Sequence, residues 1–272
     1  MVEHDDQVMD RTEEVEEGRD AYALDETLRG RLRALVAAGD DAGIDALMAP
    51  LHPADIADLL EQVSEGERAA WLALWSRGID GEVLSELDWG LREEVIGLLP
   101  DKVLADAVRE LDSDDVVDLV EDLEEAQVEA ILDVLEPSDR VAVEQALAYP
   151  EDSAGRLMQR EVVHAPEHWT VGEMIDHLRA QKRALPEQFY HVVLTDPRMK
   201  PTGHVTLGRL LSSPRKTGLK EITEDSFRTI PATQHEDDVA YAFNQYHLIS
   251  APVVDEDGRL VGVITIDDAM GV

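Results

Sequence analysis

The chain has no cysteine, which excludes disulfide bonds, thiolate chemistry and metal sites built on cysteine. It is also poor in basic residues, with 24 Lys and Arg against 60 Asp and Glu, and its formal net charge is −36. Nucleic acids and anionic membrane surfaces are not expected as direct partners, because both repel a polyanion. Such a charge favours cations as ligands, although most individual carboxylates are expected to be solvated surface groups.

Long apolar runs are missing as well. Nowhere do about 18 apolar residues follow one another, as a membrane-spanning helix requires. The amino terminus is acidic and lacks the basic and apolar segments of a secretory signal, so we expect a cytosolic chain. The sequence stops at Val272, four residues after Asp268, where a helix is beginning. This is consistent with the chain being the first part of a longer protein.

Acidic residues are concentrated in the first half of the sequence. Residues 1–155 hold 43 acidic and 11 basic residues, whereas residues 156–272 hold 17 and 13. Residues 1–24 are charged and poorly patterned, and we predict a disordered acidic tail there. From residue 25 to residue 150, apolar residues recur at helical spacing between short polar breaks. Because three segments also resemble one another, we predict a right-handed superhelix of stacked short helices; the segments are 99–111, 111–123 and 135–147.

The remaining sequence has a mixed pattern that is richer in Val, Pro and His. We predict two units, 151–222 and 223–272, each with a helix followed by two strands. The expected helices and strands are 170–182, 190–195 and 204–207 in the first unit, and 239–246, 251–254 and 260–264 in the second. A turn containing Gly258 joins the last two strands as a hairpin. The second unit ends in Thr-x-x-Asp, at Thr265 and Asp268, and resembles half of a cystathionine-β-synthase (CBS) regulatory domain. The predicted fold class is α plus α/β, with an all-helical superhelical domain followed by a tandem CBS pair.

Several motifs in a fixed order extend this resemblance. They are LHPADIA at 51–57, GEVLSEL at 81–87, LDSDDVVD at 111–118 and EDSAGRLM at 151–158, followed by the terminal CBS unit. Together they resemble the cytosolic part of an MgtE-type magnesium transporter over roughly residues 25–270. The resemblance implies a position at the inner face of the membrane, beside a transmembrane pore domain of the same polypeptide. It also implies a homodimer through the CBS units.

The same resemblance implies which carboxylates share Mg²⁺ between the helical domain and the CBS pair. In the helical domain they are Glu82, Asp114 and Asp118, and in the CBS pair they are Asp237 and Asp268. Helix geometry supports Asp114 and Asp118 independently, because like charges four residues apart repel unless a cation lies between them. Mg²⁺ prefers oxygen ligands and retains several waters, so sites of a few carboxylates are sufficient. Mn²⁺ or Ca²⁺ are alternative occupants of such sites.

Three positions depart from the family pattern. His247 stands where another acidic ligand is common, so a metal site there would be weak for Mg²⁺ or would take a softer ion such as Mn²⁺ or Zn²⁺. Arg156 stands in place of a second glycine. In the first CBS unit Arg209 replaces the Asp that contacts ribose in nucleotide-binding units. Thr265 and Asp268 retain that motif in the second unit, so ATP remains a candidate ligand there.

The residues point to regulation rather than catalysis. The sequence contains no glycine-rich phosphate loop, and the segment that starts at His235 lacks the second histidine of a zinc-protease motif, so we do not expect an enzyme. We predict a Mg²⁺-sensing regulatory region in which ions bridging acidic surfaces gate a membrane pore. The alternative is a freestanding CBS sensor of adenine nucleotides that binds a partner protein.

Overall fold

A computed structural model of the chain describes residues 26–121, 123, 125–181, 185–186, 188–224 and 227–271. The predicted tail at 1–24 lies outside these residues. The chain divides into two compact units, one ending at Ala107 and the other beginning at Val108. Among the described helices, none has the length and hydrophobicity that crossing a bilayer needs.

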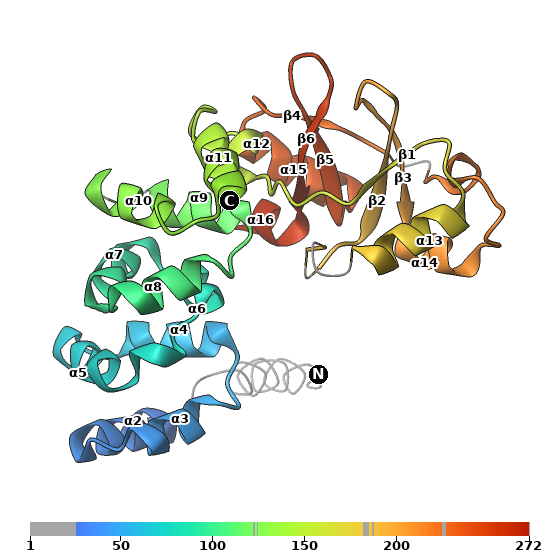
Figure 1. Cartoon of the computed structure of the whole chain (residues 1–272). Coiled ribbons are helices and arrows are strands. Elements are labelled where there is room, and N and C mark those ends of the chain that lie inside the picture. The colour runs from blue at the N-terminus through green and yellow to red at the C-terminus, as the bar shows by residue number, and fades with distance from the viewer. Residues whose placement is uncertain are drawn as a thin grey trace, which may run out of the picture. The chain divides into compact units, whose positions relative to one another are not determined.

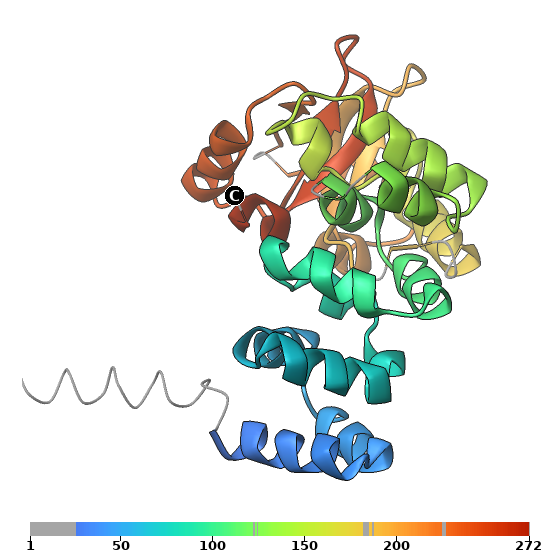
Figure 2. The same cartoon turned by 90° about the vertical axis from the view of Figure 1, so that its left-hand side faces the viewer.

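The first unit consists of short helices that follow one another as a stack, from the blue α2 to the green α8 (Figures 1 and 2). They are α2 (Glu26–Ala38), α3 (Asp41–Met48), α4 (Pro53–Gln62), α5 (Glu65–Trp75), the 3₁₀ turn η1 (Ser76–Gly78), α6 (Gly81–Ser85), α7 (Trp89–Leu98) and α8 (Asp101–Val108). Helices α2, α3 and α5 contact one another, and α4 contacts α6. The prediction of an all-helical domain of short helices is confirmed here.

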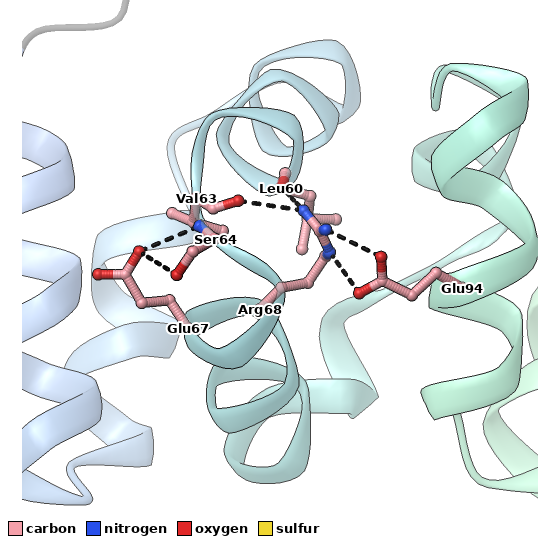
Figure 3. A network of polar contacts seen from close by, with 6 residues as sticks. All are labelled: Leu60, Val63, Ser64, Glu67, Arg68 and Glu94. Atoms are coloured by element: carbon pink, nitrogen blue, oxygen red, sulfur yellow. Dashed lines mark hydrogen bonds and ion pairs between the residues drawn. The ribbon is translucent and has the colours of Figure 1, made fainter.

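Polar cap residues mark the starts of several of these helices. Asp40, Asp80 and Asp88 accept hydrogen bonds from backbone N–H groups at the starts of α3, α6 and α7. At the start of α5, the Glu67 carboxylate accepts hydrogen bonds from the backbone N–H and hydroxyl of Ser64 (Figure 3). These bonds and the Arg33 guanidinium lower the pKa of Glu67 to about 2.

A buried arginine joins α4, α5 and α7 (Figure 3). The guanidinium of Arg68 donates to both Glu94 carboxylate oxygens at 2.9 Å. It also donates to the backbone carbonyls of Leu60 and Val63, which end α4, at 2.5 and 3.2 Å. Because only 6% of Arg68 is exposed, these partners compensate for the loss of water around its charge.

The second unit begins with further helices and continues into two small sheets. The helices are α9 (Ser113–Glu121), α10 (Glu125–Leu132), α11 (Pro137–Ala146) and the single turn α12 (Ala154–Leu157). Helix α9 contacts α10, α11 and α12. The positions of α9 and α11 agree with the sequence repeats at 111–123 and 135–147.

The two sheets have the same topology. In the first, β1 (His164–Pro166) pairs parallel with β2 (His191–Thr195), which pairs antiparallel with β3 (Pro201–Thr206). In the second, β4 (Ile230–Pro231), β5 (Ser250–Val254) and β6 (Leu260–Thr265) repeat these directions. The helical elements of this part are α13 (Val171–Ala180), α14 (Leu207–Ser212), the 3₁₀ turn η2 (Leu219–Ile222), α15 (Glu236–Tyr246) and α16 (Ile266–Met270). The helix followed by an antiparallel pair of strands is the arrangement predicted for each CBS unit, whereas the parallel strands β1 and β4 were not predicted.

Cap residues account for the differences from the predicted element bounds. The helix predicted at 239–246 begins at Glu236, because the His235 side chain accepts a hydrogen bond from the Asp237 N–H. The strand predicted at 204–207 begins at Pro201 and ends at Thr206, whose hydroxyl caps α14. The hairpin strands lie as predicted, with one residue added to each.

Each sheet packs its helices around its own core. The first core contains Val171 and Met174 of α13 with Val192 and Leu194 of β2. The second contains Phe243, Val253 and Ile264, and it also takes in Ala154 and Met158 from the segment that leads toward β1. That segment is held close at Gly262, where an added Cβ would lie 2.8 Å from the backbone carbonyl of Gln159.

Candidate cation site

Two helices of the second unit begin with carboxylates. Helix α9 carries Asp114 and Asp115 in its first turn, and α16 carries Asp267 and Asp268. The residue before α16, Thr265, donates from its backbone N–H and its hydroxyl to Asp268 Oδ2, at 3.2 and 2.6 Å. The same hydroxyl lies 2.5 Å from Asp267 Oδ1. Thr265 therefore fixes both carboxylates of α16.

The carboxylates of α9 and α16 act on one another electrostatically. Asp114 is only 7% exposed, and burial followed by the charge of Asp268 raises its pKa well above its usual range. Burial and the same Asp268 carboxylate raise the pKa of Asp115 to about 7. Burial raises the pKa of Asp268 to about 6, although the hydrogen bonds from Thr265 act in the opposite direction. We call Asp114, Asp115, Asp267 and Asp268 the aspartate cluster.

The aspartate cluster has the chemistry of a site for a hard divalent cation. Ionised carboxylates that repel one another in a buried environment destabilise the fold until protons or a cation neutralise them. Among the described residues, no three carboxylate or imidazole groups meet closely enough to enclose a metal ion. Mg²⁺ does not require such a cage, because it retains waters and binds through one or two carboxylates. The donors present fit this mode of binding.

Hydrogen bonds at both ends of α9 hold the cluster in position. At the start of the helix, the Ser113 hydroxyl donates to Glu161 Oε2 at 2.8 Å and accepts from the Arg160 N–H at 2.8 Å. At its end, Glu121 receives a hydrogen bond of 2.5 Å from Arg156 of α12. Arg156 also donates to the backbone carbonyls of Tyr149 and Leu147. The arginine that departs from the family pattern thus links α12 to α9.

The structure brings together only some of the residues that the sequence singled out. The charge of Asp268 raises the pKa of Asp114, and the exposed Asp118 is one of the charges that raise the pKa of Asp115. Asp237 lies in the first turn of α15 with 84% of its side chain exposed. Glu82 is an exposed residue of α6 in the first unit.

His247 has a structural role at the end of α15. It is exposed and adopts the left-handed conformation, with φ of 52°, that ends the helix. Arg209 of the first CBS unit is paired with an acid, since its Nε lies 2.9 Å from Glu224 Oε1. At the position where nucleotide-binding units carry a ribose-binding carboxylate, this chain therefore has an arginine that forms an ion pair with Glu224.

Sequence reasoning missed Asp115 and Asp267. Asp115 follows the predicted ligand Asp114, and Asp267 precedes the predicted ligand Asp268. Both lie in the first turn of a helix, where carboxylates are common because they interact favourably with the helix dipole. The usable signal was the run of acids before each apolar stretch, at 112–115 and 267–268. It shows that a carboxylate is near the helix start but not which one faces another helix.

Thr265 also lines a narrow pocket between the two sheets. The pocket is bordered by His191 and His204 of the first sheet and by Ser250 and Pro252 of the second. Its cavity volume is about 20 Å³, which is room for a single water. Asp268 is not among its lining residues. In this conformation the pocket does not accommodate an adenosine.

Comparison with known proteins gives a consistent result. A model of the MgtE intracellular N domain matches residues 51–152, and a CBS domain model matches residues 219–272. The magnesium transporter MgtE of Thermus thermophilus is 30% identical over 254 residues, which are 92% of this chain and 56% of that protein. Its counterpart from Bacillus subtilis is 25% identical over 222 residues, 82% of this chain and 49% of that protein. The chain therefore spans about half the length of these curated relatives.

Solved structures show the same fold. The cytosolic domain of the Mg²⁺ channel MgtE in complex with ATP superposes with a TM-score of 0.80 at 29% identity, covering 89% of this chain and 99% of that one. The soluble part of a magnesium transporter superposes with a TM-score of 0.75 at 21% identity, covering 90% and 96%. The order of elements, the two domain models and these relatives agree. The chain belongs to the MgtE family, of which it carries the intracellular N domain and a CBS pair.

Proposed function

We propose that this chain is the Mg²⁺-sensing regulatory region of a magnesium transporter. The observation that carries the proposal is that the charge of Asp268 on α16 acts on two buried or partly buried carboxylates of α9, Asp114 and Asp115, and raises their pKa. Helix α9 lies within the segment matched by the MgtE N-domain model, and α16 lies within the segment matched by the CBS model. A cation bound at the aspartate cluster would therefore connect the two kinds of domain.

The mechanism follows from electrostatics. Without a cation, the carboxylates of α9 and α16 repel one another, and their contact is weakened. A bound Mg²⁺ neutralises this repulsion and stabilises the contact. An ion shifts such an equilibrium only by its difference in affinity for the two states, and a cluster that exists only when the helices meet provides that difference. The population with α9 held on α16 therefore rises with Mg²⁺ concentration.

Direct ligation falls to few side chains. Asp268 and one of the two α9 carboxylates, Asp114 or Asp115, would supply the oxygens, and water would complete the octahedral shell. Thr265 would orient Asp268, because its hydroxyl and N–H already hold that carboxylate. Further cation sites at Glu82, Asp118, Asp237 and His247 remain part of the proposal, with Mn²⁺ or Ca²⁺ as alternative occupants. Several weak sites acting together would make the response to Mg²⁺ steep.

The effect on transport is the last step of the proposal. The curated relatives are magnesium transporters about twice the length of this chain. By analogy, the chain would lie at the cytoplasmic face of the membrane, adjoin a pore formed by the same polypeptide and pair through its CBS units as a homodimer. Occupation of the aspartate cluster at high Mg²⁺ would then hold the pore closed.

Hydrogen exchange tests the proposal without the pore. We expect MgCl₂, at fixed ionic strength, to slow amide exchange in peptides covering 111–121 and 260–271. The double variant Asp114→Asn, Asp115→Asn should lose this protection, because the ion would lose its α9 ligands. The matched control Asp139→Asn removes an exposed aspartate from the first turn of α11 and should respond like the parent chain. Protection that persists in the double variant would refute the assignment.

One observation supports the second candidate, a nucleotide sensor. Thr265 lines the pocket between the sheets, and a related cytosolic domain has been solved with ATP. The small cavity and the engagement of Asp268 by Thr265 favour the cation instead. The same exchange experiment separates the two: ATP without Mg²⁺ would protect peptides from β2 and β5 if the nucleotide reading holds. MgCl₂ alone would then have no effect.

A further inference from the structure

A second pocket in this unit has a different character from the aspartate cluster. It lies between the segment that leads into β1 and the C-terminal half of α13, and β1 is the edge strand of its sheet. Its cavity volume is about 360 Å³, within the range of small-molecule sites. The side chains that matter for its chemistry are Arg160, Glu161, His164, Trp169, His177 and Gln181.

The polar lining is mainly basic, in a chain whose net charge is −36. Arg160 contributes a guanidinium whose Nε is buried with no hydrogen-bond partner. An unpaired buried donor is costly, and a ligand with an acceptor oxygen would satisfy it. The carboxylate in the lining, Glu161, is already engaged, because its Oε2 accepts from the hydroxyl and the N–H of Ser113 at 2.8 and 3.4 Å.

Two imidazoles add to the basic lining. Burial and the neighbouring His177 lower the pKa of His164, so the unliganded pocket resists protonation there. A bound anion would favour the protonated form and reverse this effect. The titratable groups that face the pocket among the described residues are Arg160, Glu161, His164 and His177. Anion binding should therefore strengthen as the pH falls through the range in which histidine titrates.

An aromatic wall stands beside these charges. Trp169 packs edge to face with His177, with ring centroids 5.1 Å apart at an interplanar angle of 71°. Leu185 and Pro186 add apolar surface. An indole face is suited to stacking against a flat ring. The pocket thus combines a donor for an oxyanion with a surface for a ring.

We propose that this pocket binds a small phosphate monoester that carries a flat ring. Arg160 receives the phosphate oxygens, the ring lies against Trp169, and the imidazoles of His164 and His177 complete the polar wall. The site is separate from the aspartate cluster and takes a ligand of opposite charge, so it does not depend on Mg²⁺ sensing. Through the bonds of Arg160 and Glu161 to Ser113, an occupant would contact residues that hold the start of α9.

Phenyl phosphate, titrated into the full chain, is the probe that tests this proposal. EDTA removes Mg²⁺, and NaCl at about 0.15 M screens the net charge. Binding is followed by the NMR signals of the Trp169 indole N–H and the His164 and His177 ring protons. We expect saturable shifts with phenyl phosphate, weaker binding of inorganic phosphate and no response to benzyl alcohol. Lowering the pH from 8 to about 6.5, where phenyl phosphate is still mostly a dianion, should tighten binding.

Variants identify the residues responsible. Arg160→Gln should raise the dissociation constant for phenyl phosphate about tenfold or more, which is the usual effect of losing a charge-assisted hydrogen bond. It leaves the backbone bond to Ser113 in place. Arg198→Gln, on an exposed turn between β2 and β3, is the matched control and should bind like the parent chain. His164→Gln should bind with reduced dependence on pH.

The proposal fails if phenyl phosphate gives no saturable shift, or if Arg160→Gln binds as tightly as Arg198→Gln. Shifts confined to His191 and His204 would also overturn it, because they would place the ligand in the pocket between the sheets. None of these results bears on the aspartate cluster, since Mg²⁺ is absent throughout.

Discussion

Replacing Asp115 by Asn should stabilise the second unit at neutral to alkaline pH in the absence of Mg²⁺. The reason is the repulsion and burial that raise the pKa of Asp115 to about 7. An unfolded aspartate has a pKa of about 3.9. Between these values the folded chain holds a proton that the unfolded chain has released. Rising pH therefore favours unfolding through this range, and the whole penalty is present above pH 7.

The size of the effect follows from the shift. Raising the pKa of Asp115 from its usual value to about 7 lowers the free energy of unfolding by roughly 4 kcal/mol between pH 4 and pH 8. This is an upper value for the group. Asp114 and Asp268 share the same repulsion, so the three titrate together and the removal of one charge relieves the others as well. Because the Asn amide must also be buried, we expect a net gain of about 2 kcal/mol at pH 8. The gain should vanish near pH 4, where the aspartate is protonated.

Urea unfolding in EDTA measures this gain in stability. The NMR signals of His191 and His204 report on the second unit, in which Asp115 lies. Comparing the variant with the parent chain at each pH cancels the titration of groups that do not interact with Asp115 and leaves that of the coupled aspartates. Mg²⁺ at ten times its dissociation constant should stabilise the parent chain by about 1.4 kcal/mol and the variant by less. An Asn variant that is no more stable at pH 8, with the same dependence on pH as the parent, would contradict the electrostatic account.

Three further predictions concern other parts of the molecule. Glu94→Gln should destabilise the first unit by about 2 kcal/mol, since Arg68 would keep its buried charge without the carboxylate. Urea unfolding followed by tryptophan fluorescence measures this change. A loss of stability below about 0.5 kcal/mol would show that the ion pair is not needed. Burial and the nearby His204 lower the pKa of His191 to about 4, so the contribution of the neutral imidazole to stability is complete above about pH 6.5 and is lost as the pH falls toward 4. His191→Asn should flatten this part of the plot of unfolding free energy against pH. An unchanged plot would contradict the prediction. Gly262→Ala should destabilise the second unit through the close contact with Gln159, whereas Gly208→Ala, with no atom within 4 Å, should be tolerated; equal melting temperatures for the two variants would refute the contact argument.

Much of the fold is readable from local sequence. Apolar spacing and short polar breaks predicted the short helices, and the turn at Gly258 predicted the last hairpin, because both signals act over a few residues. The start of α15 was misplaced because it depends on His235 acting as a cap, a role more typical of Ser, Thr, Asp or Asn. The packing of Ala154 and Met158 into the second core could not be predicted, since it depends on contacts with residues about 80 to 110 positions away.

The candidate site was predictable only in part for a related reason. Helix periodicity places Asp114 and Asp118 on one face, but Asp114 is buried and Asp118 is exposed. What covers a turn depends on tertiary packing, which the spacing of residues along one helix does not encode. The same limit hid Asp115, whose raised pKa arises chiefly from burial and from Asp268 across the contact.

The central claim is that a divalent cation binds between α9 and α16. Mn²⁺ tests it most directly, because it prefers the same oxygen ligands as Mg²⁺ and broadens the NMR signals of nearby nuclei. The account predicts that substoichiometric Mn²⁺ broadens the amide signals of Asp114, Asp115, Asp267 and Asp268 first, and that excess Mg²⁺ restores them. Broadening that begins elsewhere and leaves these four signals sharp would contradict it.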